Sequence, residues 1–173
     1  TAYDFPALNN GFVKKVTLED GNLPGATGFV FNLRREKFQD EKVREALGLM
    51  FNFTWTNESL QYGLFQQRDS FWQNSDLQAQ NLPEGLELEY LEQVRDLVDP
   101  SIFTEPVVMP HSSGDRQLDR RNLRKASGLM DEAGWDVGDD GLRRKNGATF
   151  DLEFLSVSPS FDRIILPYLD NLK

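Results

Sequence analysis

Residues 28–51 read GFVFNLRREKFQDEKVREALGLMF, and two patterns meet in this stretch. The run of Phe and Val within residues 26–33 has Gly and Pro on one side and charges on the other, which is typical of a buried strand. Over residues 41–51 apolar side chains recur at intervals of three and four, which predicts a helix with Asp40 as its N-cap. Its buried face comprises Val43, Ala46, Leu47 and Met50. A strand followed by a helix favours a mixed α/β fold.

Further elements are expected on both sides of this stretch. GFVKKVTL, residues 11–18, contains enough apolar residues for another short strand. Thr54 and Gly63 predict the start and the end of a second helix over residues 55–62. A third helix is expected after Pro83. The inward face of that helix would be formed by Tyr90, Leu91, Val94, Leu97 and Val98.

The C-terminal half predicts a helix, a hairpin and another helix. Asp119 is expected to cap a helix that ends at Gly134, where a left-handed backbone is common. Asn146-Gly147 separates two strand-like runs and supplies the positive backbone angles of a type I′ hairpin. We therefore expect one domain over residues 1–173, of α/β (mixed α+β) class. It would combine a small sheet, including the C-terminal hairpin, with about five helices.

Composition excludes several classes of protein. The 173 residues are 39% hydrophobic and 12% aromatic, which suits one buried core. The net charge of -9 would repel the phosphates of nucleic acid. The absence of cysteine excludes disulfides, thiolate metal sites and a cysteine nucleophile. No segment approaches the ~20 apolar residues that span a bilayer. Both ends of the sequence suggest a piece of a longer protein.

No motif predicts catalysis, a metal site or a cofactor. His111 is the one histidine and has no second histidine with which to form a metal cluster or a triad. DVGDDG, residues 136–141, is similar to a calcium loop but places Gly147 where an EF-hand requires Glu. A polar turn is the better interpretation. The basic cluster at residues 120–125 lies among acids and is expected to form a solvated face or ion pairs.

The aromatic residues between positions 51 and 76 have two expected roles. Phe51, Phe53 and Phe65 are interpreted as core. The segment RDSFWQNSD instead places hydrogen-bonding side chains around a ring, as solute clefts do. Its predicted ligand-binding residues are Arg68, Asp69, Ser70, Trp72 and Asn74, with Gln73 among them in the sequence. A purely structural role for Trp72 stays open.

Four phrases in this order resemble the extracellular solute-binding proteins of family 5. They are GFVFNLRREKFQDEKVREAL (28–47), FNFTWTNESLQYGLFQQRDSFWQNSDLQA (51–79), NLRKASGLMDEAGW (122–135) and SPSFDRIILPYLDNLK (158–173). In particular, the phrases look like the branch associated with oligopeptide and microcin C uptake. The resemblance implies a periplasmic receptor with two lobes that close over a solute. Residues 1–173 would form part of its second lobe.

The resulting hypothesis is the substrate-binding component of an ABC-type importer. It would capture an oligopeptide-like solute in the periplasm or cell envelope and deliver it to a membrane permease, without catalysis, cofactor or nucleic acid. Its partners would be the solute, the permease and the remaining lobe of the same protein. A carbohydrate-active hydrolase domain, with two carboxyl groups beside Trp72 or Trp55, is one alternative. A protein-interaction module that uses Trp72 and the helix face at residues 120–125 is another.

Overall fold

The structure is a computed structural model that describes residues 5–18, 22, 25 and 27–173. The chain divides into two compact units. Unit 1 contains Thr1–Ala26 and Ser70–Val107, and unit 2 contains Thr27–Asp69 and Val108–Lys173. Together they form a mixed fold of helices and a small antiparallel sheet, as the sequence predicts. A single domain over residues 1–173 stays a prediction.

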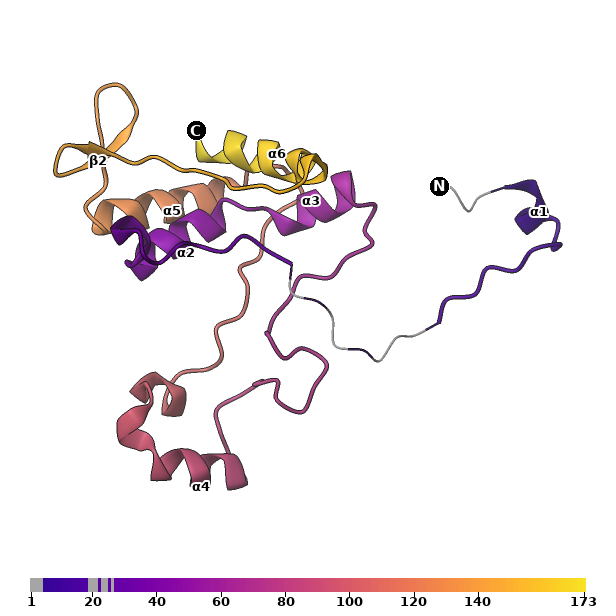
Figure 1. Ribbon diagram of the computed structural model, residues 1–173, viewed down its shortest axis with the longest axis horizontal. Coiled ribbons are helices and arrows are strands. Elements are labelled where there is room, and N and C mark those ends of the chain that lie inside the picture. The colour runs from indigo at the N-terminus through magenta and orange to yellow at the C-terminus, as the bar shows by residue number, and fades with distance from the viewer. Residues whose placement is uncertain (1–4, 19–21, 23–24, 26) are drawn as a thin grey trace. The chain divides into compact units, whose positions relative to one another are not determined.

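Two helices of unit 2 form the centre of its core. α2 (Glu41–Leu49) lies beside α5 (Arg120–Glu132), and the two bury their apolar faces against each other (Figure 1). The side chain of Asp40 accepts a hydrogen bond from the Lys42 N–H, which confirms the predicted cap. The buried core residues of the pair and its surroundings are Val43, Ala46, Leu47, Leu49, Met50, Ala126, Met130, Ala133, Trp135 and Tyr168.

An aromatic cluster joins α6 (Asp162–Leu172) to this core. Tyr168 is buried, and its ring lies 5.5–5.7 Å from those of Phe29, Phe51 and Phe154. Its hydroxyl donates a 2.7 Å hydrogen bond to the Leu47 carbonyl of α2. The prediction that Phe51 belongs to the core is therefore confirmed. α6 follows a 3-10 turn, Pro159–Phe161.

The sheet of unit 2 is short and antiparallel, in the order β1 (Asp136–Val137), β2 (Arg143–Lys145) and β3 (Ala148–Thr149). The φ angles of 52° at Asn146 and 81° at Gly147 lie in the left-handed region, as the predicted hairpin turn requires. The sheet is attached to α5 because the Arg143 guanidinium contacts the Asp131 carboxylate and the Trp135 carbonyl, both at 2.6 Å.

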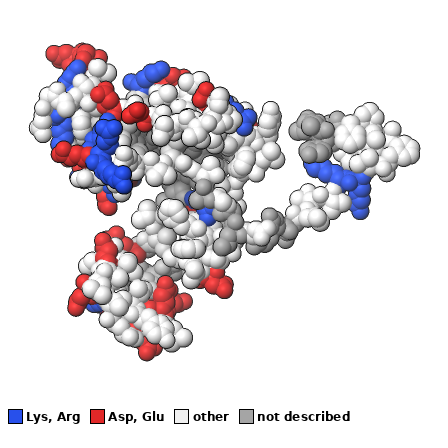
Figure 2. Space-filling view, in the orientation of Figure 1, with Lys and Arg blue, Asp and Glu red and all other residues white. Residues whose placement is uncertain are grey.

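Unit 1 contains α1 (Pro6–Asn9), α4 (Gly85–Gln93) and two 3-10 turns, Arg95–Leu97 and Pro100–Phe103. The helix expected after Pro83 is present, but its predicted inward face is wrong. Tyr90 is 65% exposed and Leu97 is 84% exposed, and α4 contains no buried residue. The described part of unit 1 offers no core for this apolar face. Figure 2 shows acidic side chains gathered around α4.

Other sequence expectations need correction. The described part of residues 11–18 and of residues 26–33 contains no strand. Phe65 is exposed rather than part of the core. The helix predicted over residues 55–62 is α3 (Phe53–Leu60). It begins earlier because the side chain of Asn52, and not that of Thr54, caps it through the Trp55 N–H.

Residues 150–157 follow the hairpin without joining a strand. Half-buried Phe150, Leu152 and Phe154 alternate with exposed residues, which is the side-chain pattern of a strand with one buried face. No N–H of residues 151–157 donates a hydrogen bond to another described residue. This segment is therefore attached to the core by the side chains of Leu152 and Phe154, and the Asp151 carbonyl accepts a hydrogen bond from Lys37 Nζ.

Substitution by alanine should change the stability in opposite directions at two glycines, one just after the end of α5 and one in its middle. Gly134→Ala should lower the free energy of unfolding by about 1 kcal/mol, because Gly134 has a φ of +80°. Gly128→Ala should raise it by about 0.5–1 kcal/mol, because Gly128 lies in the helix with open space around its Cα. Urea unfolding measures both changes. Equal changes in the free energy of unfolding at the two positions would contradict a left-handed backbone at Gly134.

None of the helices formed by the described residues has the length and apolar character of a bilayer-spanning segment.

Candidate functional site

The predicted ligand-binding residues are divided between the two units in the sequence. Arg68 and Asp69 end the first stretch of unit 2, whereas Ser70, Trp72 and Asn74 belong to unit 1. Their assembly into one site stays a prediction, and each group is therefore described within its own unit.

A series of tight turns orders residues 70–78. The Ser70 hydroxyl accepts a hydrogen bond from the Trp72 N–H at 3.1 Å. The Trp72 carbonyl then accepts from the Ser75 N–H at 3.0 Å and from the Ser75 hydroxyl at 2.7 Å. Asn74 has a φ of 65°, and its N–H donates to Gln78 Oε1 at 3.0 Å. The backbone around Trp72 is thus fixed by local hydrogen bonds, while its indole is 53% exposed.

Gln73 differs from its neighbours because it is buried. Its Oε1 atom has no hydrogen-bond donor, and it is the one such buried side-chain atom found in the described part of the chain. A buried acceptor without a donor costs about 1–3 kcal/mol, so natural structures contain few. The exposed indole of Trp72 therefore stands next in sequence to a buried amide whose Oε1 has no donor among the described residues.

A second ordered region surrounds His111 in unit 2. The His111 Nε2 atom lies 3.1 Å from the Phe51 carbonyl, so this nitrogen carries the hydrogen and donates it. Asn52 Nδ2 donates to the carbonyls of Gly114 and Arg116 at 2.8 and 2.7 Å. His111 thus anchors an irregular connection through a structural partner.

Two more asparagines hold the same connection. Asn122 Nδ2 donates to the Ser112 carbonyl and the Ser113 hydroxyl, both at 3.0 Å. Asn171 Nδ2 donates to the carbonyls of Met50 and Gln117 at 2.9 and 3.0 Å. Buried side-chain amides therefore replace the backbone ladder that this segment lacks.

Asp119 closes the connection and starts α5. Its carboxylate accepts from the backbone N–H groups of Gly114, Arg121 and Asn122 at 2.8–3.1 Å. These hydrogen bonds favour the ionised form and lower the pKa of Asp119, chiefly through the Asn122 and Gly114 N–H groups. Asp119 is the cap that the sequence predicts.

Several carboxyl groups have a pKa shifted by their hydrogen bonds. The described carboxyl groups with a shifted pKa are Glu92, Asp99, Asp119 and Asp140, and each has its pKa lowered. Asp140 forms two 2.6 Å hydrogen bonds with Arg144, which hold its pKa well below the ordinary value. The described residues also contain no group of three or more side chains placed to hold a metal ion.

Comparison with known proteins decides the family. The model described as bacterial extracellular solute-binding proteins, family 5 Middle, matches residues 2–173. The chain belongs to this family. The resemblance of the four phrases is thereby confirmed, and the family description is one of solute binding outside the cytoplasm rather than of catalysis.

Individual relatives of this family 5 chain are much longer than it is. "Probable peptide-binding protein YejA" of Agrobacterium fabrum is 44% identical over 178 residues, which cover 100% of this chain and 28% of the relative. "Uncharacterized protein YejA" of Escherichia coli K12 is 35% identical and covers 100% of this chain and 29% of the relative. "Peptidoglycan-binding protein YepA" of Agrobacterium fabrum is 33% identical, and the match covers 99% of this chain and 28% of the relative. The chain thus spans less than a third of these relatives.

Sequence reasoning missed the buried amides of Asn52, Asn122 and Asn171, although a signal existed. Asn122 lies four residues before Ala126 on the buried stripe of α5, and Asn171 lies three residues after buried Tyr168. A polar amide in register with an apolar stripe is expected to be buried and hydrogen-bonded.

Proposed function

We propose that this family 5 chain is part of the second lobe of a receptor that captures oligopeptide-like solutes and delivers them to the permease of an ABC importer. The observation that carries the proposal is the family match over residues 2–173, together with a 44% identical relative named as a probable peptide-binding protein. We place the receptor in the periplasm or cell envelope, because the family is named for extracellular solute binding.

The candidate solute-contacting residues are Arg68, Asp69, Ser70, Trp72 and Asn74. The half-exposed indole of Trp72 offers an apolar platform, and its backbone is fixed in advance by the turn of residues 70–75. An ordered backbone lowers the entropy lost on binding. The unsatisfied Oε1 of the adjacent Gln73 is an acceptor that a peptide N–H can satisfy after a small local opening.

The mechanism is noncovalent capture by closure. A solute that contacts both lobes stabilises the closed state, since a ligand shifts an equilibrium only through its different affinities for the two states. A chain that supplies part of one lobe makes only some of these contacts. It should therefore bind a peptide much more weakly than the complete receptor does.

Calorimetry with one peptide tests this two-lobe account. We expect the 173-residue chain to bind at least about 100-fold more weakly than the full-length protein, a loss of about 2.7 kcal/mol. In the full-length protein, Trp72→Ala should weaken binding about tenfold or more, which is about 1.4 kcal/mol. Tyr90→Ala, which alters an exposed ring on α4, is the matched control and should change little. Equal affinity of chain and full-length protein would refute the account.

A further inference from the structure

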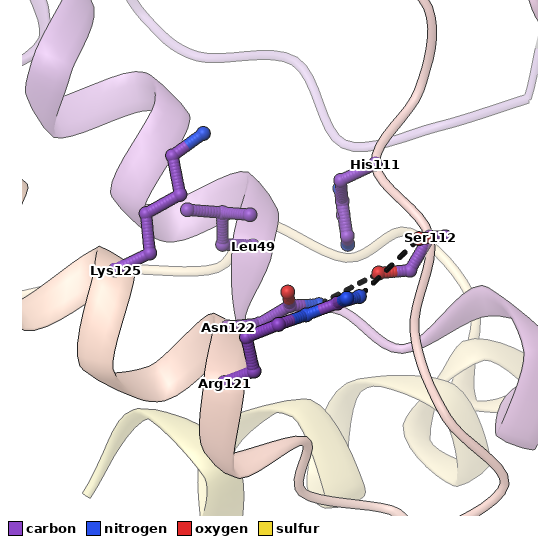
Figure 3. Close-up of a pocket in the computed structure, with 6 residues that line it drawn as sticks. All are labelled: Leu49, His111, Ser112, Arg121, Asn122 and Lys125. Atoms are coloured by element: carbon purple, nitrogen blue, oxygen red, sulfur yellow. Dashed lines mark hydrogen bonds between the residues drawn. The ribbon is translucent and has the colours of Figure 1, made fainter.

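A hollow of about 310 Å³ lies beside the first turns of α5, entirely within unit 2 (Figure 3). We call it the α5 pocket. It is lined by Leu49, His111, Ser112, Arg121, Asn122 and Lys125. These residues come from α2, from the irregular connection and from α5, and none belongs to the segment at residues 68–74.

The Arg121 guanidinium is the main hydrogen-bond donor of the α5 pocket. It runs beneath the ring of His111 in Figure 3 and contacts the Ser112 hydroxyl at 3.4 Å. Among the described residues this is the one side-chain hydrogen bond of the guanidinium, and the Asp119 carboxylate also attracts it electrostatically. Since a guanidinium carries five N–H donors, most of them stay available to a ligand.

The floor of the α5 pocket is fixed by buried residues. Leu49 and Asn122 are each about 5% exposed. The two hydrogen bonds from Asn122 Nδ2 to Ser112 and Ser113 set the orientation of the amide, and they leave its Oδ1 pointing toward the space between Leu49 and His111 (Figure 3). The pocket therefore has a rigid floor with one apolar and one polar side.

The charges around the α5 pocket limit the kind of anion that fits. Lys125 forms a 2.6 Å ion pair with Glu45, and the Asp119 carboxylate is held by backbone N–H groups near the start of α5. Lys125 is thus paired with Glu45, whereas Arg121 has the weaker electrostatic attraction of the Asp119 carboxylate and forms no close ion pair with a described residue. A singly charged anion is favoured over a dianion, and a planar carboxylate matches the guanidinium fork. The Oδ1 atom of Asn122 is also an acceptor, so it repels a ligand such as phosphate that presents oxygen atoms in every direction.

We propose that the α5 pocket binds the carboxylate group of a small organic acid through Arg121. The ring of His111 and the side chain of Leu49 cover the organic part of the acid. This site is formed by other residues than the proposed solute contacts, and the argument for it does not depend on them.

Nuclear magnetic resonance on the complete 173-residue chain tests the site, with acetate as the probe at constant ionic strength. We expect saturable shifts of the Arg121 Nε–H and His111 ring signals with a millimolar Kd, since so small a ligand gains at most about 1.5 kcal/mol per heavy atom. Acetamide, the neutral analogue, should cause no saturable shift. Phosphate should bind at least about tenfold more weakly than acetate.

Two variants separate specific binding from a general effect of charge. Arg121→Gln should abolish the saturable shift of the His111 ring signals on addition of acetate. The remaining amide signals should keep their positions, which shows that the variant is folded. Arg124→Gln removes the same charge from the same helix outside the pocket lining and should preserve the response. Equal responses to acetate and acetamide, phosphate binding as tight as acetate binding, or an unchanged response in Arg121→Gln would each overturn the proposal.

Discussion

An Asn52→Ala variant should lose about 2–4 kcal/mol of its free energy of unfolding. Asn52 Oδ1 caps α3 through the Trp55 N–H, and its Nδ2 group satisfies the carbonyls of Gly114 and Arg116. The substitution therefore removes a helix cap and leaves two carbonyls without their donor. Urea unfolding monitored by tryptophan fluorescence measures the change.

Asn52→Asp separates the two roles of this side chain. The aspartate retains an acceptor for the cap but places a negative charge against two carbonyl oxygens. It should therefore be at least as destabilising as alanine if the Nδ2 hydrogen bonds dominate. Asn57→Ala, which removes the same kind of side chain from a more exposed loop contact with Phe65, is the control and should cost about 1 kcal/mol. A near-neutral Asn52→Asp would show that the cap alone accounts for the effect.

Tyr168→Ala should destabilise unit 2 by about 3–5 kcal/mol, the range for truncating a buried aromatic ring. The ring stands at the centre of the Phe29, Phe51 and Phe154 cluster, and its hydroxyl binds the Leu47 carbonyl. Tyr168→Phe keeps the ring and should cost about 1 kcal/mol at neutral pH. If the two variants unfolded at the same urea concentration, the ring contacts would contribute nothing measurable.

The same tyrosine gives stability a dependence on alkaline pH. Burial raises the pKa of the Tyr168 hydroxyl above its ordinary value of about 10. The folded chain keeps this proton while the unfolded chain releases it, so the contribution is fully present below about pH 10 and is lost as pH rises further. Tyr168→Phe lacks this group. Its unfolding free energy should therefore fall less steeply above about pH 10 than that of the unsubstituted chain.

The sequence was sufficient to predict α2 and α5, the two helices that pack against each other through their apolar stripes. The stripe of Val43, Ala46, Leu47 and Met50 is buried as expected, and Asp40 and Asp119 cap α2 and α5. The hairpin at Asn146-Gly147 was equally accessible, because two positive φ angles favour that dipeptide. These features are local in sequence, or they combine two strong local patterns.

Elements whose partners are distant in sequence were predicted less well. The expected strand over residues 26–33 requires a neighbouring ladder, and the described residues provide none. The apolar face of α4 has the right spacing, but the described part of unit 1 has no core against which it can pack. Periodicity identifies an apolar face but does not identify the surface that covers it.

The candidate solute contacts could be proposed from composition alone, but their spatial relation could not. Residue type indicated a polar segment around Trp72. It did not indicate that Gln73 would be buried with an unsatisfied oxygen. The α5 pocket was missed because its residues come from three separated stretches, and the basic cluster at residues 120–125 resembled an ordinary solvated face.

Within residues 151–157, two anchored side chains occur together with amides that form no hydrogen bond to a described residue. Side-chain order and backbone hydrogen bonding, which usually occur together, are therefore separate in this segment. Leu152 and Phe154 pack on the core, so their rotamers are restricted. Their N–H groups have no hydrogen-bond acceptor among the described residues, so hydrogen bonding does not protect them against exchange with deuterium. Rapid isotope exchange in this segment would therefore not indicate a loose structure.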